Sequence, residues 1–337
     1  MKASQLEVIL EVAIKNNFPV LIKGKAGVGK TDITTQSTSR CIHTDGLPFD
    51  LMVVHPVVQD PTEPGGIPWV INGEVHKLPF ANMRRMINAT RPLVVLIDDL
   101  GQAAISTQAA YMQVILQREL DGQPISPFVR FVAATNRKED RAGVAGILDP
   151  LLSRFYGIHE LDLNIEDWCS WAWKYNMPAS LISFAQFDKD LLLESKPSKD
   201  MENVPTGRTY ASAGKQQNAG IPKGMDFYIY KGAAGEVFAT KYISYCNIYL
   251  QLPTVGEIEN DPLGTRMPMN LSEQYALMNN ISAAMTVKNA RPLMQYLTRM
   301  PAELMAAAMV NAGKRNVSLM TSPEYTQWAI KNANYML

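Results

Sequence analysis

Short apolar runs divide the first half of the chain. Four of them predict buried strands, at 20–22, 49–54, 93–97 and 128–134. The runs are continuous, not alternating, as expected of parallel strands that are covered on both faces. Apolar residues at helical spacing predict a helix over 4–15, and the segment from Thr31 to Gly46 lacks proline and glycine until its end and can form another. The first half is therefore predicted to be α/β, with a parallel sheet flanked by helices.

Two dipeptides predict hairpins outside this sheet. Asn72-Gly73 separates 69–71 from 74–76, and Asp121-Gly122 follows a helical pattern over 107–120 and precedes 123–125. Asn-Gly and Asp-Gly favour the tight turns that join adjacent antiparallel strands. The segment 60–68 before the first hairpin is too rich in proline and glycine for a regular element.

Beyond Leu161 the patterns are helical. They cover 233–251, 272–289, 291–298, 301–312 and 322–336, and six methionines recur among them. A helical core explains these methionines better than a binding surface does. Trp168, Trp171 and Trp173 are expected on one helix, as a packed aromatic face. The polar stretches 196–201 and 214–224 are predicted to be loops.

Composition narrows the functional classes. The chain has 337 residues, 47% of them hydrophobic and 19% charged, which suits a globular protein of two domains or one domain with an appendage. Thirty-two basic residues balance thirty-two acidic ones, which argues against a nucleic-acid or membrane partner. Three separated cysteines indicate reduced thiols and a cytoplasmic location. No signal peptide or membrane-spanning run is recognisable.

One stretch carries a specific chemical signature, the phosphate-loop pattern G-x-x-x-x-G-K-[ST] at 24–31. Its residues are Gly24, Lys25, Ala26, Gly27, Val28, Gly29, Lys30 and Thr31. The pattern should arise by accident in roughly one chain in a hundred of this size, as a glycine turn without a ligand. A strand before it and a helix after it favour nucleotide binding. Backbone amides would surround phosphate oxygens, Lys30 would reach the β- and γ-phosphates, and Thr31 would ligate Mg²⁺.

Polar residues that follow the later strands extend this site. Asp98 and Asp99 come directly after the strand at 93–97, and Asn136 follows the strand at 128–134. A carboxylate at such a strand end can hold the Mg²⁺ shell, the next can orient the attacking water, and an amide can contact the γ-phosphate. Arg154 and Arg141 are candidates for an arginine that acts on a neighbouring subunit's γ-phosphate, against the ordinary alternative of a solvated arginine.

The order GKAGVGKT, LVVLIDD, AATN and LLSRF, with hairpins on both sides of the IDD strand, resembles the AAA+ ATPases and especially their MoxR-type branch. The resemblance implies a P-loop NTPase sheet followed by an all-α lid and a helical extension. It implies a nucleotide-binding domain over 1–162, with insertions at about 60–80 and 118–126. The lid would cover 163–213 and the extension 214–337.

The resemblance also implies roles for single residues. Lys30 and Thr31 match the phosphate-loop pair, Asp98 the magnesium residue, Asn136 the first sensor and Arg154 the arginine finger. Asp99 stands where the family usually has a glutamate. In the segment 205–210, Arg208 matches the second sensor, although the family usually has proline where Gly207 stands.

Two functions follow as expectations. The first is a Mg²⁺-dependent ATPase that forms a ring, most simply a hexamer, and remodels a protein client or a partner bearing a von Willebrand A domain. The second is a nucleotide-gated scaffold or binding component, phage- or defence-related, with slow turnover. Asp99 favours this slow-turnover alternative, because its side chain is one methylene shorter than that of glutamate. A nucleic-acid motor is disfavoured by the charge balance.

Overall fold

The computed structural model describes residues 1–337 except 121, 138–145, 197–200, 250 and 333–337. The chain forms two compact units, Met1–Leu163 and Asn164–Leu337. Among the described residues, no helix combines the length and apolarity that crossing a bilayer requires.

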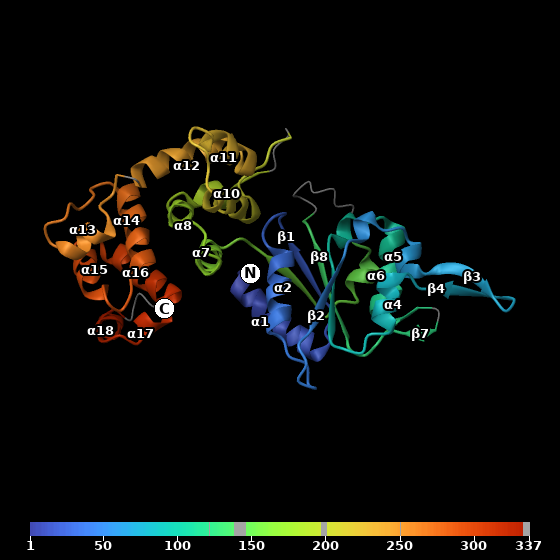
Figure 1. Cartoon of the computed structure of the whole chain (residues 1–337). Helices are drawn as coiled ribbons and strands as arrows, with labels where there is room; N and C mark the ends of the chain where they lie inside the picture. The colour runs from blue at the N-terminus through green and yellow to red at the C-terminus, as the bar shows by residue number, and fades with distance from the viewer. Residues whose placement is uncertain (121, 138–145, 197–200, 250, 333–337) are drawn as a thin grey trace. The chain divides into compact units, whose positions relative to one another are not determined.

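The first unit is organised around a five-stranded parallel sheet with the order β2-β5-β8-β1-β9 (Figure 1). Its strands are β1 (Val20–Gly24), β2 (Asp50–Val54), β5 (Leu93–Ile97), β8 (Val129–Thr135) and β9 (Gly157–Leu161). Every residue of β5 and β8 is buried, as the continuous apolar runs predict. Because all five strands are parallel, their carboxyl ends lie at one edge of the sheet.

Helices cover both faces of this sheet (Figure 1). They are α1 (Ala3–Asn16), α2 (Lys30–Arg40), α4 (Ala81–Ile87), α5 (Ile105–Leu116) and α6 (Asp149–Leu152). Successive strand residues point to opposite faces, so Val20 and Ile22 pack in one hydrophobic core with α1, whereas Leu21 packs in the other. These two cores fix the sheet edge from which the phosphate loop emerges.

The predicted hairpins are present beside the sheet. The first pairs β3 (Ile67–Ile71) with β4 (Glu74–Leu78), and the second pairs β6 (Glu119–Leu120) with β7 (Gln123–Pro124). Asn72 and Gly73 have φ angles of 52° and 86°, the left-handed pair that a type I′ turn requires. The short elements η1 (Pro56–Val58), α3 (Thr62–Gly65) and η2 (Leu100–Gln102) complete this unit.

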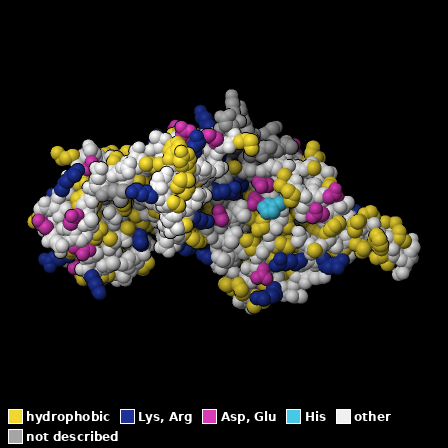
Figure 2. Space-filling view, turned by 45° about the horizontal axis from the view of Figure 1, so that its top comes forward, with side chains coloured by type: hydrophobic (Ala, Val, Ile, Leu, Met, Phe, Trp, Pro, Cys, Tyr) yellow, Lys and Arg dark blue, Asp and Glu magenta, His cyan; other side chains and the backbone are white. Residues whose placement is uncertain are grey.

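The β3–β4 hairpin exposes apolar side chains on both of its faces. Trp69 is 59% exposed, Val70 64% and Val75 70%. Figure 2 shows hydrophobic side chains gathered on this projecting element. Among the described residues, all five positions of β3 are exposed.

Every regular element among the described residues of the second unit is a helix. Its helices are α7 (Ile165–Lys174), α8 (Ala179–Phe187), α9 (Lys189–Leu193), α10 (Gly207–Ala219), α11 (Asp226–Ala234), α12 (Glu236–Tyr249), α13 (Val255–Asn260), α14 (Leu271–Ala284), α15 (Ala290–Leu297), α16 (Ala302–Arg315), α17 (Val317–Met320) and α18 (Pro323–Lys331). Together with the sheet, these helices confirm the predicted α/β class, a parallel sheet flanked by helices and followed by a helical region.

Aromatic side chains form the centre of the second unit. Phe184 lies within ring-contact distance of Tyr210, Phe238 and Tyr242, and Tyr210 meets Trp168 edge-to-face. All five side chains are buried. The tryptophan-rich helix is thus part of a packed core, as expected. Most of the recurring methionines are buried as well, at Met278, Met285, Met300 and Met309.

Several details of the predicted elements were wrong. The segment 60–68, expected to hold no regular element, contains α3, and the helix expected over 272–289 ends at Ala284. The stretch 214–224, expected to be a loop, belongs to α10 as far as Ala219. That helix also crosses residue 213, where the lid was expected to end, and the division into lid and extension stays a prediction. The helix expected over 107–120 ends at Leu116, because its last residues pair as β6. The strand β9 was not predicted.

Gln108 joins α5 to the segment before α6. Its side chain is fully buried and uses all of its polar groups: Nε2 donates to the carbonyls of Ala103 (3.1 Å) and Gly146 (2.9 Å), and Oε1 accepts from the amide of Leu148 (3.1 Å). The glutamine therefore satisfies backbone groups on both sides of this connection.

We expect Gln108→Leu to lower the free energy of unfolding of the first unit by about 1–3 kcal/mol, because it leaves one buried and two partly buried backbone groups without this partner. Hydrogen exchange of the β5 amides measures the change. Gln117→Ala, at an exposed position after α5, is the matched control and should leave exchange unaltered. Equal exchange in both variants would show that the bridge contributes little.

Candidate nucleotide site

The loop between β1 and α2 has a backbone that only glycine permits at several points. Gly27 and Gly29 have φ angles of 75° and 102°, in the left-handed region that disfavours other residues. A Cβ on Gly24 would lie 2.7 Å from the carbonyl oxygen of Leu161 on β9. The first glycine is therefore required by the close approach of β9, and the others by the turn into α2.

Lys30, the first residue of α2, points back across this loop. Its side chain is 7% exposed, and Nζ donates to the carbonyls of Gly24 (2.9 Å) and Lys25 (3.0 Å) and to Asn136 Oδ1 (2.7 Å). Asn136 follows β8, which pairs directly with β1. The predicted phosphate-loop lysine and the predicted sensor amide are thus in direct contact.

Thr31 and Asp98 form a second contact at the same edge. The Thr31 hydroxyl donates to Asp98 Oδ2 at 2.6 Å, and the buried Asp98 accepts a further bond at Oδ1 from the amide of Asp99 (3.0 Å). A hydroxyl and a carboxylate so placed offer two oxygen ligands. Mg²⁺ in nucleotide sites uses one or two protein oxygens, with phosphates and water completing the octahedron, so this pair fits that ion.

Asp99 lies at the end of β5 in an unusual backbone conformation. Its φ and ψ angles are 57° and 33°, and it precedes the 3₁₀ turn η2. Its Oδ1 accepts from Gln102 Nε2 (2.8 Å) and from Asn136 Nδ2 (3.3 Å). Asn136 consequently bridges Lys30 and Asp99, and a chain of hydrogen bonds crosses from the phosphate loop to the second carboxylate.

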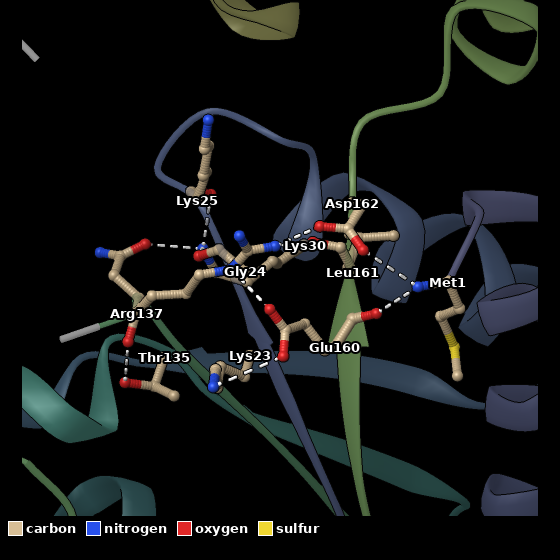
Figure 3. A network of polar contacts seen from close by, with 11 residues as sticks. Met1, Lys23, Gly24, Lys25, Lys30, Thr135, Arg137, Glu160, Leu161 and Asp162 are labelled. Carbon is tan, nitrogen blue, oxygen red and sulfur yellow. Dashed lines mark hydrogen bonds and ion pairs between the residues drawn. The ribbon is translucent and has the colours of Figure 1, made fainter. Parts of the chain in front are cut away.

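Figure 3 shows a further polar network beside the loop. Arg137, the residue after Asn136, pairs with Glu160 (3.0 Å) and with Asp162, and it donates to the carbonyl of Leu161 (3.4 Å). Lys23 of β1 approaches Glu160 at 3.5 Å. These pairs join the ends of β8, β1 and β9, the three strands around the loop.

This network changes the pKa of the Asp162 carboxylate. Its partial burial would raise its pKa, but hydrogen bonds and charge from Arg137 and the amino group of Met1 lower the pKa on balance. The Asp162 side chain is 59% exposed, although that of Arg137 is only 14% exposed, so we assign the pair a role in positioning the strand ends and no large share of stability.

The cysteines take no part in the site. Burial raises the pKa of Cys169 to about 12 and that of Cys246 to about 11, so both remain thiols near neutral pH. Over the described ranges, no group of three or more His, Cys, Asp or Glu side chains could hold a metal ion.

The structure brings together five of the residues predicted from the sequence: Lys30, Thr31, Asp98, Asp99 and Asn136. Arg154 follows α6, and its Nε is buried without a hydrogen-bond partner among the described residues. Arg208 lies in the first turn of α10 in the other unit. Arg141 lies outside the described residues. The roles of these three arginines stay predictions.

Sequence reasoning missed two residues that support the site, Gln102 and Arg137. Gln102 follows Asp99 by three positions, and the two come into contact because the chain forms the 3₁₀ turn η2 there. Arg137 had a visible signal, since it follows the sensor asparagine directly, but its acidic partners lie on and just after β9, which was not predicted.

No protein-family model matches the sequence, and no curated protein matches it. Among solved structures, the RuvB Holliday junction branch migration motor of Thermotoga maritima aligns at 18% identity over 73% of this chain and 69% of its own, with a TM-score of 0.38. NtrX from Brucella abortus in complex with ATP aligns at 11% identity over 99% of this chain and 68% of its own, with a TM-score of 0.40. Similarities this low tell nothing of this chain's substrate or partners.

We expect Gly24→Ala to weaken ATP binding by more than about tenfold, since the new Cβ forces the loop away from Leu161. Equilibrium titration with a fluorescent ATP analogue measures this. Gly232→Ala, on α11 with open space around the position, is the control and should bind as the wild type does. Wild-type affinity in Gly24→Ala would contradict the close fit of loop and strand.

Proposed function

We propose that this protein binds and hydrolyses ATP as a ring-forming AAA+ ATPase of the MoxR type, and that hydrolysis drives the remodelling of a protein client. The observation that carries the proposal is the hydrogen-bonded series Lys30–Asn136–Asp99 beside the Thr31–Asp98 pair. Nucleotide binding rests on this geometry. The ring and the client rest on the sequence resemblance, and the cytoplasmic location rests on the three separated cysteines.

In this proposal each residue has a distinct task. Amides of the glycine loop and the N-terminus of α2 bind the phosphates, and the ammonium group of Lys30 offsets the β- and γ-phosphate charge. Thr31 and Asp98 hold Mg²⁺, which neutralises charge on the phosphate oxygens when bound.

Asp99 would serve as the general base. It accepts a proton from a water molecule while the water oxygen bonds to the γ-phosphorus and the bond to the ADP oxygen breaks. Asn136 orients the Asp99 carboxylate and the γ-phosphate. Arg154 completes the site of a neighbouring copy by stabilising negative charge in the transition state, and Arg208 would contact nucleotide from the helical unit.

The client-facing element in this proposal is the β3–β4 hairpin. Exposed apolar side chains such as Trp69, Val70 and Val75 suit contact with protein surfaces. A partner with a von Willebrand A domain is a candidate on the MoxR resemblance alone.

Asp99 supports a second candidate, a nucleotide-gated scaffold or binding component of phage or defence origin with slow turnover. An aspartate is one methylene shorter than the glutamate common at this position, so its oxygen lies farther from the attacking water. The two candidates share the site and differ in the rate of hydrolysis.

We expect Lys30→Ala to abolish ATP binding and turnover, because the substitution removes the phosphate-facing ammonium group. Calorimetric titration and release of inorganic phosphate measure the two effects. Lys288→Ala, at an exposed position of the helical unit, is the matched control. Unchanged ATP affinity in Lys30→Ala would exclude the proposed site, whereas wild-type binding without measurable turnover would favour the scaffold.

Arg154→Ala should retain ATP binding and lose turnover, because the arginine acts on the next subunit. Asp98→Asn should also be inactive, by a defect in its own subunit. Mixing the two variants places an intact arginine beside an intact carboxylate at some interfaces, so partial activity should return. Assembly measured by light scattering is the control, and failure of complementation in intact rings would contradict a shared site.

A further inference from the structure

The carboxylate of Asp99 is oriented by a side chain without an assigned role, that of Gln102. The contact follows from the local fold. Asp99 takes the left-handed conformation and begins η2, so Gln102 donates its backbone amide to the Asp99 carbonyl at 3.0 Å. Residues three apart in a 3₁₀ turn lie one above the other, and this places the amide of Gln102 over the carboxylate.

Two amides hold the same carboxylate oxygen. Gln102 Nε2 donates to Asp99 Oδ1 at 2.8 Å, and Asn136 Nδ2 donates to it at 3.3 Å. Neither donor uses Oδ2. The carboxylate is thus fixed through one oxygen, and the other can accept a hydrogen bond or a proton.

The orientation of the Gln102 amide carries a cost. Its Oε1 is buried and has no hydrogen-bond partner among the described residues. The opposite orientation would place this oxygen against the carboxylate, where two acceptors repel. The donor therefore faces Asp99 even though the side-chain carbonyl then lacks a partner among the described residues.

We infer that Gln102 is a positioning residue that adapts the short Asp99 to the general-base role. This inference rests on the proposed ATPase function and names a residue that function does not otherwise require. A glutamate could place its carboxylate near the water with its own extra methylene. Here two amide donors fix the direction of the shorter aspartate side chain. Oδ2 then accepts the proton as the water attacks the γ-phosphorus.

The ordinary alternative is that the Gln102 side chain only caps the turn. In that case its loss would reduce stability, and any loss of activity would not depend on which carboxylate stands at position 99. Kinetics that separate binding from turnover distinguish the two.

The test uses Gln102→Ala and Gln102→Met in the full chain, the second of which keeps the side-chain length and removes the donor. We expect kcat for Mg-ATP to fall about tenfold in both, with the affinity for a slowly hydrolysed ATP analogue within about twofold of the wild type. The exposed Gln117→Ala is the matched control and should retain wild-type kcat.

A second arm repeats Gln102→Ala in an Asp99→Glu background. The longer side chain does not need this amide, so kcat there should change less than about twofold. Unchanged kcat in Gln102→Ala and Gln102→Met, an equal loss in both backgrounds, or a loss that follows ATP affinity would each overturn the inference. Wild-type turnover no higher than that of Lys30→Ala would overturn the proposed ATPase function as well, whereas normal turnover without Gln102 would overturn this inference alone.

Discussion

The site depends on the parallel alignment of three neighbouring strands. Because β5, β8 and β1 run in the same direction and pair side by side, the residues after them meet at one sheet edge. Asp98, Asn136 and the glycine loop come from segments far apart in the chain, yet they join through Lys30 and Thr31. Buried apolar residues on both faces of the sheet stabilise this alignment. The hydrophobic cores therefore also determine where the site residues lie.

The charged side chains at this sheet edge form two groups. Lys30 is held by neutral carbonyl and amide oxygens, which position the ammonium group for phosphate. The ion pairs of Arg137 with Glu160 and Asp162 lie outside it and tie the strand ends together. Binding and support are thus separate sets of side chains, although Asn136 and Arg137 are adjacent.

Elements and site residues with a strong local sequence pattern could be predicted from the sequence. β5 was expected with its observed bounds because it is entirely apolar, and five site residues came from motifs at strand ends. β9 escaped notice because it is an edge strand, where only Leu161 is buried and His159 and Glu160 interrupt the pattern. Gly214 suggested a loop, but it lies within α10, where a Cβ would sit 2.8 Å from Leu181 of α8. Contacts such as Gln102 with Asp99 need backbone angles that residue types do not reveal.

We propose that the loop at 24–31 binds a triphosphate together with Mg²⁺. Calorimetric titration of the wild-type chain with a slowly hydrolysed ATP analogue, with Mg²⁺ and with a chelator, tests it most directly. We expect one saturable site per chain, with an affinity for the analogue that falls when Mg²⁺ is removed. No saturable heat at millimolar nucleotide, or affinity indifferent to Mg²⁺, would contradict it.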